Sequence, residues 1–262
     1  MVIFSAVAMV FYGIALILVT SRLFHPNGPN RKAVAMLAAV GVVCHALALY
    51  NVVFTADGQN LSLTNMISLV CWIIALTFTI VLQHVKAIIL VPVVFACAII
   101  SVALLWLVPP QYIRHFGENP EVLVHVVMAL MAYSTLVIAA LYAVQLWFIQ
   151  NRLKSKQLKV SPVMPPLMTV ERQLYHLVII GMILLSLSLA TGFIFMDGLF
   201  KGPQGHKAVL SSMAWLVYIT MLWQQYTKGV RIRTAVIYTI SGAFLLSLSY
   251  FGARIVKELI LS

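Results

Sequence analysis

Acidic residues are scarce in this chain: 262 residues include six Asp and Glu, and charged residues of both signs make up 9% of the sequence. Soluble globular domains carry roughly 25% charged residues, which cover the surface that faces water. Hydrophobic residues instead make up 63% of this chain. This composition excludes an ordinary soluble domain and predicts an integral membrane protein. The formal net charge of +11 then indicates loops that set membrane topology, and no nucleic-acid partner is expected.

Several motifs of soluble and redox chemistry are absent as well. The chain holds three cysteines, Cys44, Cys71 and Cys97, and no Cys-x-x-Cys pair, which argues against thiol–disulfide exchange and c-type haem attachment. It also lacks a P-loop, G-x-G-x-x-G, G-x-S-x-G and H-E-x-x-H. No apolar run contains an Asp or Glu of the kind that proton-coupled transporters place at mid-membrane. We therefore expect a protein that is not an enzyme.

Long apolar runs are abundant. Eight runs without charged residues reach the roughly 18–20 residues that a helix needs to cross a bilayer. Because the bilayer core offers no water, each run must satisfy its own backbone as a helix. We predict an all-α integral membrane protein, a bundle of eight transmembrane helices that forms a single polytopic membrane domain over residues 1–262. The predicted spans are about 1–21, 33–56, 61–83, 87–108, 122–148, 173–196, 208–226 and 234–254.

Basic residues are distributed unevenly between the loops. The loops after the first, third, fifth and seventh spans hold 12 of the 17 Lys and Arg residues, and the opposite face holds five of the six acids. The positive-inside rule places the first set in the cytoplasm, which puts the N-terminus and the C-terminus outside. A basic and then Pro-rich stretch at about residues 150–172 predicts a linker between a five-helix part and a three-helix part.

Histidine offers the remaining chemistry, because polar side chains within a membrane are costly and mark functional sites. Two histidines are predicted at the outer surface on different helices: His125 near the start of the fifth span and His206 just before the seventh. Two imidazoles at one level suit the two axial positions of a haem iron, whose porphyrin supplies the other four ligands. The alternative is that both are interfacial polar residues that hydrogen-bond to loops.

A haem also needs an apolar slot and cations for its propionates. The outer helix ends offer apolar and basic candidates for these roles: Trp215, Tyr133, Met128 and Met213 for the slot, and Arg114, Lys201 and Lys207 for the propionates. Other histidines have simpler interpretations: His25 and His115 as solvated loop residues, His45 as a hydrogen-bonding partner of a neighbouring helix, and His84 and His176 as interface anchors or a second, inner site.

Four segments carry a family resemblance. They are residues 59–72, residues 122–148 beginning Val-Leu-Val-His125, residues 165–192 ending in Thr191-Gly192, and residues 206–252 ending in Tyr250-Phe-Gly. Together they resemble the cytochrome c assembly protein family of haem-handling membrane proteins (the CcsA and CcmC type), and most closely its HemX/YpjD-like branch. The resemblance implies a multi-pass protein of the bacterial inner (plasma) membrane, with an outward haem site and His125 as one axial ligand.

The chain also departs from the family pattern. The family's tryptophan-rich motif ending in W-D-P-K-E is missing, and Lys207 and Trp215 stand where its lysine and a later tryptophan fall. Trp223 stands where the family has an inner histidine. His206 as second ligand is therefore an inference from its level and chemistry, not a residue carried over.

The expected function is a haem-binding, haem-handling membrane protein of cytochrome c assembly type. Its cofactor would be haem b, ligated near the outer face by His125 and His206, with Lys207, Trp215 and Arg114 around it. Its partners would be haem, membrane lipid, and a cytochrome-assembly protein or another membrane protein. The alternative is a non-catalytic regulatory or structural membrane subunit that retains the fold without haem, which the missing tryptophan motif favours.

Overall fold

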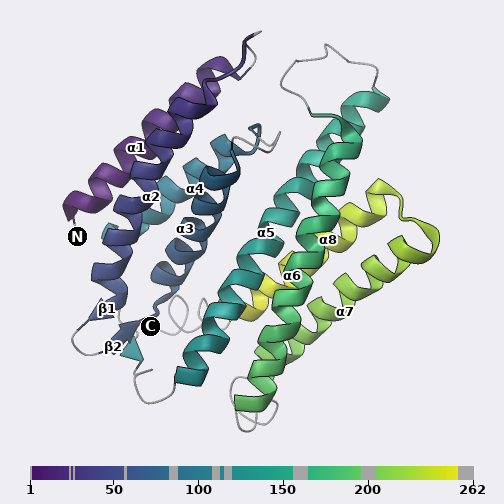
Figure 1. The fold of residues 1–262 in the computed structure, drawn as a ribbon. Helices are drawn as coiled ribbons and strands as arrows, with labels where there is room; N and C mark the ends of the chain where they lie inside the picture. The colour runs from purple at the N-terminus through teal and green to yellow at the C-terminus, as the bar shows by residue number, and fades with distance from the viewer. Residues whose placement is uncertain are drawn as a thin grey trace. The chain divides into compact units, whose positions relative to one another are not determined.

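The computed structural model describes residues 2–23, 25, 27–55, 58–82, 88–107, 113–114, 120–155, 165–195 and 205–252. These residues are almost entirely helical, and the chain divides into two compact units. Unit 1 comprises residues 1–115 and 159–165, and unit 2 comprises residues 116–158 and 166–262. Figure 1 shows the helices of both units.

The described part of unit 1 contains four helices: α1 (Val2–Arg22), α2 (Arg31–Val53), α3 (Leu63–Val81) and α4 (Val91–Leu107). They close into a ring, because α1 packs on α2 and α4, and α3 packs on the same two helices. Two helices begin at caps that the sequence encodes: the Asn30 side chain accepts from the Ala33 N–H, and Ser62 accepts from the Asn65 N–H. Such caps satisfy donors that a helix start leaves unpaired.

The core of unit 1 holds a buried polar cluster around His45. Its Nε2 lies 2.9 Å from the Ser68 hydroxyl on α3, and its Nδ1 lies 3.5 Å from the Tyr12 hydroxyl on α1. Tyr12 is fully buried and stacks on Phe95 of α4 with ring centroids 5.5 Å apart. Four helices therefore meet at one hydrogen-bonded aromatic cluster, and the expectation that His45 hydrogen-bonds to a neighbouring helix is confirmed.

A small antiparallel sheet joins two loops of unit 1. Its strands are β1 (Phe54–Thr55), β2 (Gly58–Asn60) and β3 (Ile113–Arg114), in the order β1-β2-β3. Gln59 is opposite Phe54 on one side and Arg114 on the other. Gly58 has a φ of 125°, which glycine adopts without the strain that a side chain would add.

Unit 2 contains α5 (Pro120–Lys154), α6 (Leu167–Phe195), α7 (Gly205–Lys228) and α8 (Ile232–Ser247), which continues into a π-helix, η1 (Leu248–Gly252). Helix α5 packs on α6 and α8, and α7 packs on α6, α8 and η1. Glycine allows close approach at two of these contacts. A Cβ at Gly181 would lie 2.6 Å from Leu136 of α5, and one at Gly242 would lie 2.5 Å from the Tyr218 ring of α7.

Six helices in the described part of the chain are long and apolar enough to cross a membrane: α1, α2, α3, α5, α6, and α8 together with η1. Helix α4 has 17 described residues, and α7 has 24 residues but is not among these six. Many large hydrophobic side chains on the helices are exposed, as expected for surfaces that face lipid. An integral membrane fold is therefore supported, whereas eight crossings and outside termini stay predictions.

The structure departs from the sequence predictions in three places. Helix α5 runs to Lys154 and α6 starts at Leu167, although the predicted spans ended at 148 and began at 173. The predicted spans covered only the length that crosses the hydrocarbon, whereas a helix can continue beyond it. The predicted five-plus-three division is wrong, because α5 packs with α6 and α8 in unit 2. The three short strands were not predicted, since two or three residues show no periodicity.

Candidate functional site

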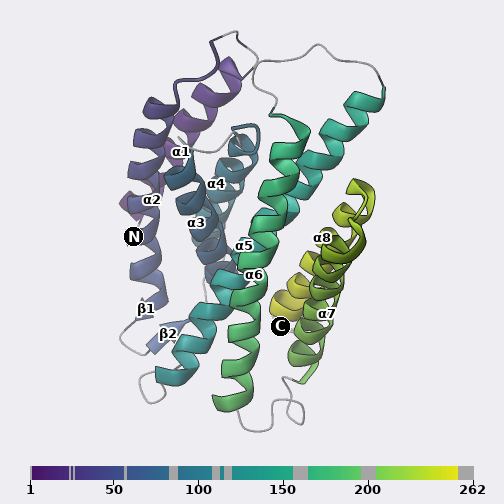
Figure 2. The same ribbon diagram turned by 45° about the vertical axis from the view of Figure 1, so that its right-hand side comes forward.

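One end of unit 2 gathers the start of α5, the end of α6 and the start of α7, as Figures 1 and 2 both show. The chain also ties η1 to this end: the Ser249 hydroxyl donates to the Lys207 carbonyl at 2.9 Å and lies 2.8 Å from the Ser211 hydroxyl. Four elements that are separate in the sequence therefore meet here. We call this region the His125 end of unit 2, because His125 lies in the second turn of α5.

His125 is half-buried against α6. Its Nδ1 lies 2.9 Å from the backbone carbonyl oxygen of Ser188 and 3.3 Å from the Thr191 hydroxyl oxygen. A carbonyl oxygen only accepts hydrogen bonds, so the proton of a neutral imidazole must sit on Nδ1. The Thr191 hydroxyl directs its own proton to the carbonyls of Leu187 and Ser188, and so it also accepts from His125.

This hydrogen bond leaves the lone pair of the ring on Nε2. None of the residues in the described ranges forms a hydrogen bond with His125 Nε2. Histidines that bind metals show the same division, since their second nitrogen donates to a carbonyl, a carboxylate or water, which fixes the tautomer and orients the ring. His125 is therefore held in the state that a metal ligand requires.

His206 is the second residue of α7, at the same end of unit 2, and its side chain is exposed. Helices α5 and α7 each pack on α6 and α8. Within the described residues no hydrogen bond joins His206 to His125, and no group of three or more His, Cys, Asp or Glu side chains gathers there to hold a metal. Convergence of the two imidazoles on one iron stays a prediction.

The three accessory residues have different positions. Lys207 follows His206, is half-buried, and accepts the Ser249 hydrogen bond through its carbonyl. Trp215 lies further along α7, and its indole N–H donates to the Ser186 hydroxyl of α6 at 2.8 Å. Arg114 belongs to β3 of unit 1, and its side chain lies outside what the structure describes. Trp215 thus joins α7 to α6, and Lys207 brings a cation to the His125 end.

Other predicted candidates fall partly outside the described residues. Lys201, His84 and His115 are not among them. Tyr133 is buried, with its hydroxyl 2.9 Å from that of Ser247. Its ring stacks on Tyr250 of η1 at 4.9 Å between centroids and meets Phe251 edge-on at 5.6 Å. Tyr133, which was predicted to line the apolar slot near His125, therefore belongs to an aromatic cluster that packs α5 against η1.

Sequence reasoning missed the two α6 partners of His125. Ser188 acts through its backbone carbonyl, which has no signature in the sequence. The one available signal was the group of hydroxyl residues at Ser186, Ser188 and Thr191 in the otherwise apolar second half of α6. The π-helix was also missed, although π-helical turns are frequent at functional sites.

The hydroxyl of Thr191 allows a matched test of this arrangement. Thr191→Val removes the weaker acceptor of His125 Nδ1 and keeps the shape of the side chain, whereas Thr191→Ser keeps the hydroxyl. If His125 ligates a metal centre, we expect Thr191→Val to weaken haem affinity roughly tenfold, the lower end of the range for partners of ligating histidines. Haem titration followed by absorbance measures this effect. Equal affinity of the valine and serine variants would remove Thr191 from the site.

The chain is similar in sequence to a known protein family and to curated proteins. The sequence profile described as cytochrome C assembly protein matches residues 33–261. Three curated relatives, each named inner membrane protein YpjD, come from Escherichia coli strain K12, E. coli O6:H1 and E. coli O157:H7. Each is 43% identical over 262 residues, which covers 99% of this chain and 100% of the relative. No solved structure matches the chain.

Proposed function

Because the chain belongs to the cytochrome c assembly protein family, we propose that it binds haem b at the His125 end of unit 2 and takes part in cytochrome assembly or haem handling. The resemblance carried by the four sequence segments is confirmed, and so is the multi-pass inner-membrane location. Haem as a ligand, the two-histidine ligation and the outward position belong to the proposal. The positive-inside rule supports the outward position, since the basic residues Arg152, Lys154, Arg172 and Lys228 lie near the opposite ends of α5, α6 and α7.

One observation carries the proposal: the hydrogen bond from His125 Nδ1 to the Ser188 carbonyl at 2.9 Å. The acceptor is a backbone carbonyl within α6, so its position is fixed by the helix and does not depend on the rotamer of a partner side chain. While this hydrogen bond is made, the neutral ring presents Nε2 as a lone-pair donor. Iron accepts such imidazole nitrogens readily.

The donor set at the His125 end fits a haem better than a bare metal ion. The described residues hold no group of three or more His, Cys, Asp and Glu side chains that could bind a metal, whereas protein zinc sites use three or four side chains. A porphyrin supplies four ligands itself and needs axial donors only. His206 is exposed at the first turn of α7 and is the proposed second donor, and Lys207 beside it is the proposed cation for a propionate.

Haem bound in this way would supply an iron centre whose redox and ligand chemistry the protein positions and tunes. The residues of the chain would hold and orient it: His125 through Nε2, Ser188 and Thr191 by fixing the imidazole, and Trp215 by keeping α7 against α6. We propose ligation and delivery, with no reaction turned over by side chains of this protein.

The proposal is tested on protein purified in detergent after expression with haem supplied. Wild-type protein is expected to show a Soret band and a haem content approaching one per chain. Co-purification separates this function from the alternative of a haem-free regulatory subunit. A stoichiometric membrane partner without a chromophore would contradict the proposal, because the subunit would then act through its partner alone.

A further inference from the structure

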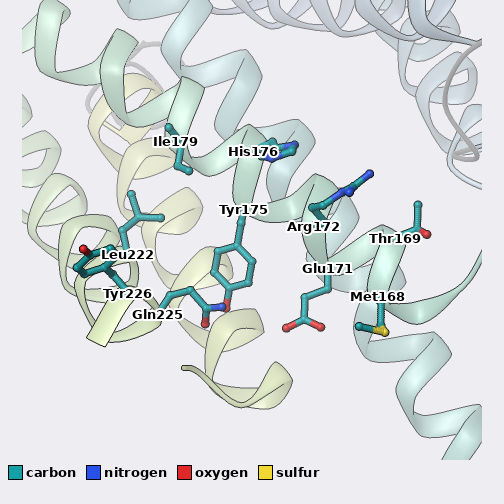
Figure 3. Close-up of a pocket in the computed structure, with 10 residues that line it drawn as sticks. All are labelled: Met168, Thr169, Glu171, Arg172, Tyr175, His176, Ile179, Leu222, Gln225 and Tyr226. Atoms are coloured by element: carbon teal, nitrogen blue, oxygen red, sulfur yellow. The ribbon is translucent and has the colours of Figure 1, made fainter. Parts of the chain in front are cut away.

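The opposite end of unit 2 contains a groove that the proposed haem function does not use. It lies between the start of α6 and the end of α7 and has a volume of about 710 Å³. Glu171, Arg172, Tyr175 and His176 of α6 line it together with Gln225 of α7. Ile179 and Leu222 add apolar surface. Figure 3 shows the ten residues around this space.

Tyr175 carries an unmet hydrogen-bonding group into the groove. Its side chain is 9% exposed, and its hydroxyl has no partner among the described residues. Buried tyrosine hydroxyls nearly always have a partner, because removing one from water without a replacement costs about 1–3 kcal/mol. In Figure 3 the Tyr175 ring extends toward the side chain of Gln225. The groove is therefore built to receive a polar group.

Gln225 can donate a hydrogen bond to a polar group in the groove. Its Oε1 accepts from the Val230 N–H at 2.7 Å, which fixes the side chain where the chain leaves α7. Its amide nitrogen then remains as the donor, and no residue in the described ranges accepts from it. Gln225 Nε2 is therefore available to donate to an acceptor on a ligand in the groove.

Glu171 and Arg172 bring charges of both signs. Figure 3 shows the Glu171 carboxylate turned toward Tyr175 and Gln225, and the Arg172 side chain extending in a different direction. Adjacent residues on a helix do not face each other, so these two charges do not neutralise one another. The groove thus offers a carboxylate beside the tyrosine hydroxyl and a guanidinium at its edge, which is complementary to a zwitterion.

We propose that this groove binds the headgroup of phosphatidylethanolamine from the surrounding bilayer. Its ammonium group donates to the Glu171 carboxylate and the Tyr175 oxygen, and its phosphate accepts from Gln225 Nε2 and Arg172. The acyl chains then lie along Ile179 and Leu222, at the depth where the apolar part of α6 begins. Phosphatidylcholine lacks the N–H donors that Glu171 needs, and phosphatidylglycerol lacks the cation. Neither satisfies all four groups.

Native mass spectrometry of the full-length protein tests the proposal. The delipidated protein is offered an equal mixture of phosphatidylethanolamine, phosphatidylglycerol and phosphatidylcholine with identical acyl chains. We expect the ethanolamine lipid to be retained roughly tenfold more than the other two, the discrimination that a hydrogen bond to a charged group supplies. Equal retention of all three lipids by the wild type would overturn the proposal.

Variants locate the discrimination in the groove. Glu171→Gln is expected to lower retention of the ethanolamine lipid roughly tenfold. Glu121→Gln makes the same change at an exposed carboxylate of α5 and leaves retention unchanged. Glu171→Lys should reverse the preference toward phosphatidylglycerol, a gain that loss of folding cannot imitate. Wild-type selectivity in both Glu171 variants would place the lipid elsewhere. Haem content is measured on the same samples and is expected to stay constant, which keeps this test independent of the proposed function.

Discussion

His125→Ala is expected to abolish haem retention. Removing an outer partner of a ligating histidine already costs about 10–100-fold in affinity, and removing the imidazole itself costs at least as much. The variant purified beside the wild type should show almost no Soret absorbance, and its haem-to-protein ratio should fall below roughly one tenth of the wild-type ratio. The His125 side chain is only half-buried, so alanine leaves the α5–α6 contact largely in place.

His25→Ala is the matched control. His25 is an exposed histidine in the loop between α1 and α2 of unit 1, and its loss should leave the haem ratio unchanged. Circular dichroism of both variants reports helix content, which separates loss of the ligand from loss of the fold. Retention of wild-type haem by a folded His125→Ala variant would remove His125 from the ligand set.

Gly242→Ala is expected to cause a large loss of stability in unit 2. The new Cβ would lie 2.5 Å and 2.6 Å from two carbon atoms of the Tyr218 ring. That ring is fully buried, and its hydroxyl donates to the Thr239 carbonyl at 3.2 Å, so it has little freedom to move away. Overpacking of this kind costs about 1–3 kcal/mol. Thermal unfolding in detergent measures it as a clear fall in Tm.

Gly13→Ala gives the contrasting result. Nothing lies within 4 Å of a Cβ at Gly13 in α1, and alanine is a better helix former than glycine by about 1 kcal/mol. This variant should match or slightly exceed the wild-type Tm. A Tm for Gly242→Ala equal to that of the wild type would mean that α7 and α8 do not meet as described.

The helices were predictable because their signal is distributed along the chain. An apolar run of about 20 residues without charge identifies a membrane helix whatever its neighbours are. Helix α7 shows the limit of this signal. It has 24 residues but is not among the six clear spans. Polar residues lie at both of its ends: His206 and Lys207 at the start, and Gln224, Gln225 and Lys228 at the end. Composition alone therefore predicts that this segment is a helix. Whether the helix crosses the bilayer depends on what its polar ends contact.

The partners within the bundle were not predictable. Leu136 and Gly181 show no pattern that pairs them, yet α5 and α6 approach so closely there that a methyl group at 181 would overlap the leucine. The tautomer of His125 depends on the Ser188 carbonyl in the same way. A backbone acceptor is available at every residue, so only the packing of two helices decides which one a distant side chain meets.

The candidate ligand itself was identified by its type and level. His125 stood out as a polar residue near the end of an apolar run, and the family resemblance marked the same position. His206 was chosen by its level and its chemistry, and the structure places it at the start of α7, at the same end of unit 2, with an exposed side chain. The position of a residue along a helix can be read from the sequence. Whether two side chains converge depends on how each helix is turned about its own axis.

The most direct measurement of the central claim is pulsed electron paramagnetic resonance of the ferric haem protein with ¹⁵N-labelled histidine. Axial imidazole nitrogens couple to a low-spin iron, and the couplings change when histidine carries the label. We predict a low-spin signal with histidine couplings that disappear in His125→Ala and are halved in number in His206→Ala. A haem whose spectrum does not respond to labelled histidine, or wild-type protein that takes up no haem, would contradict it.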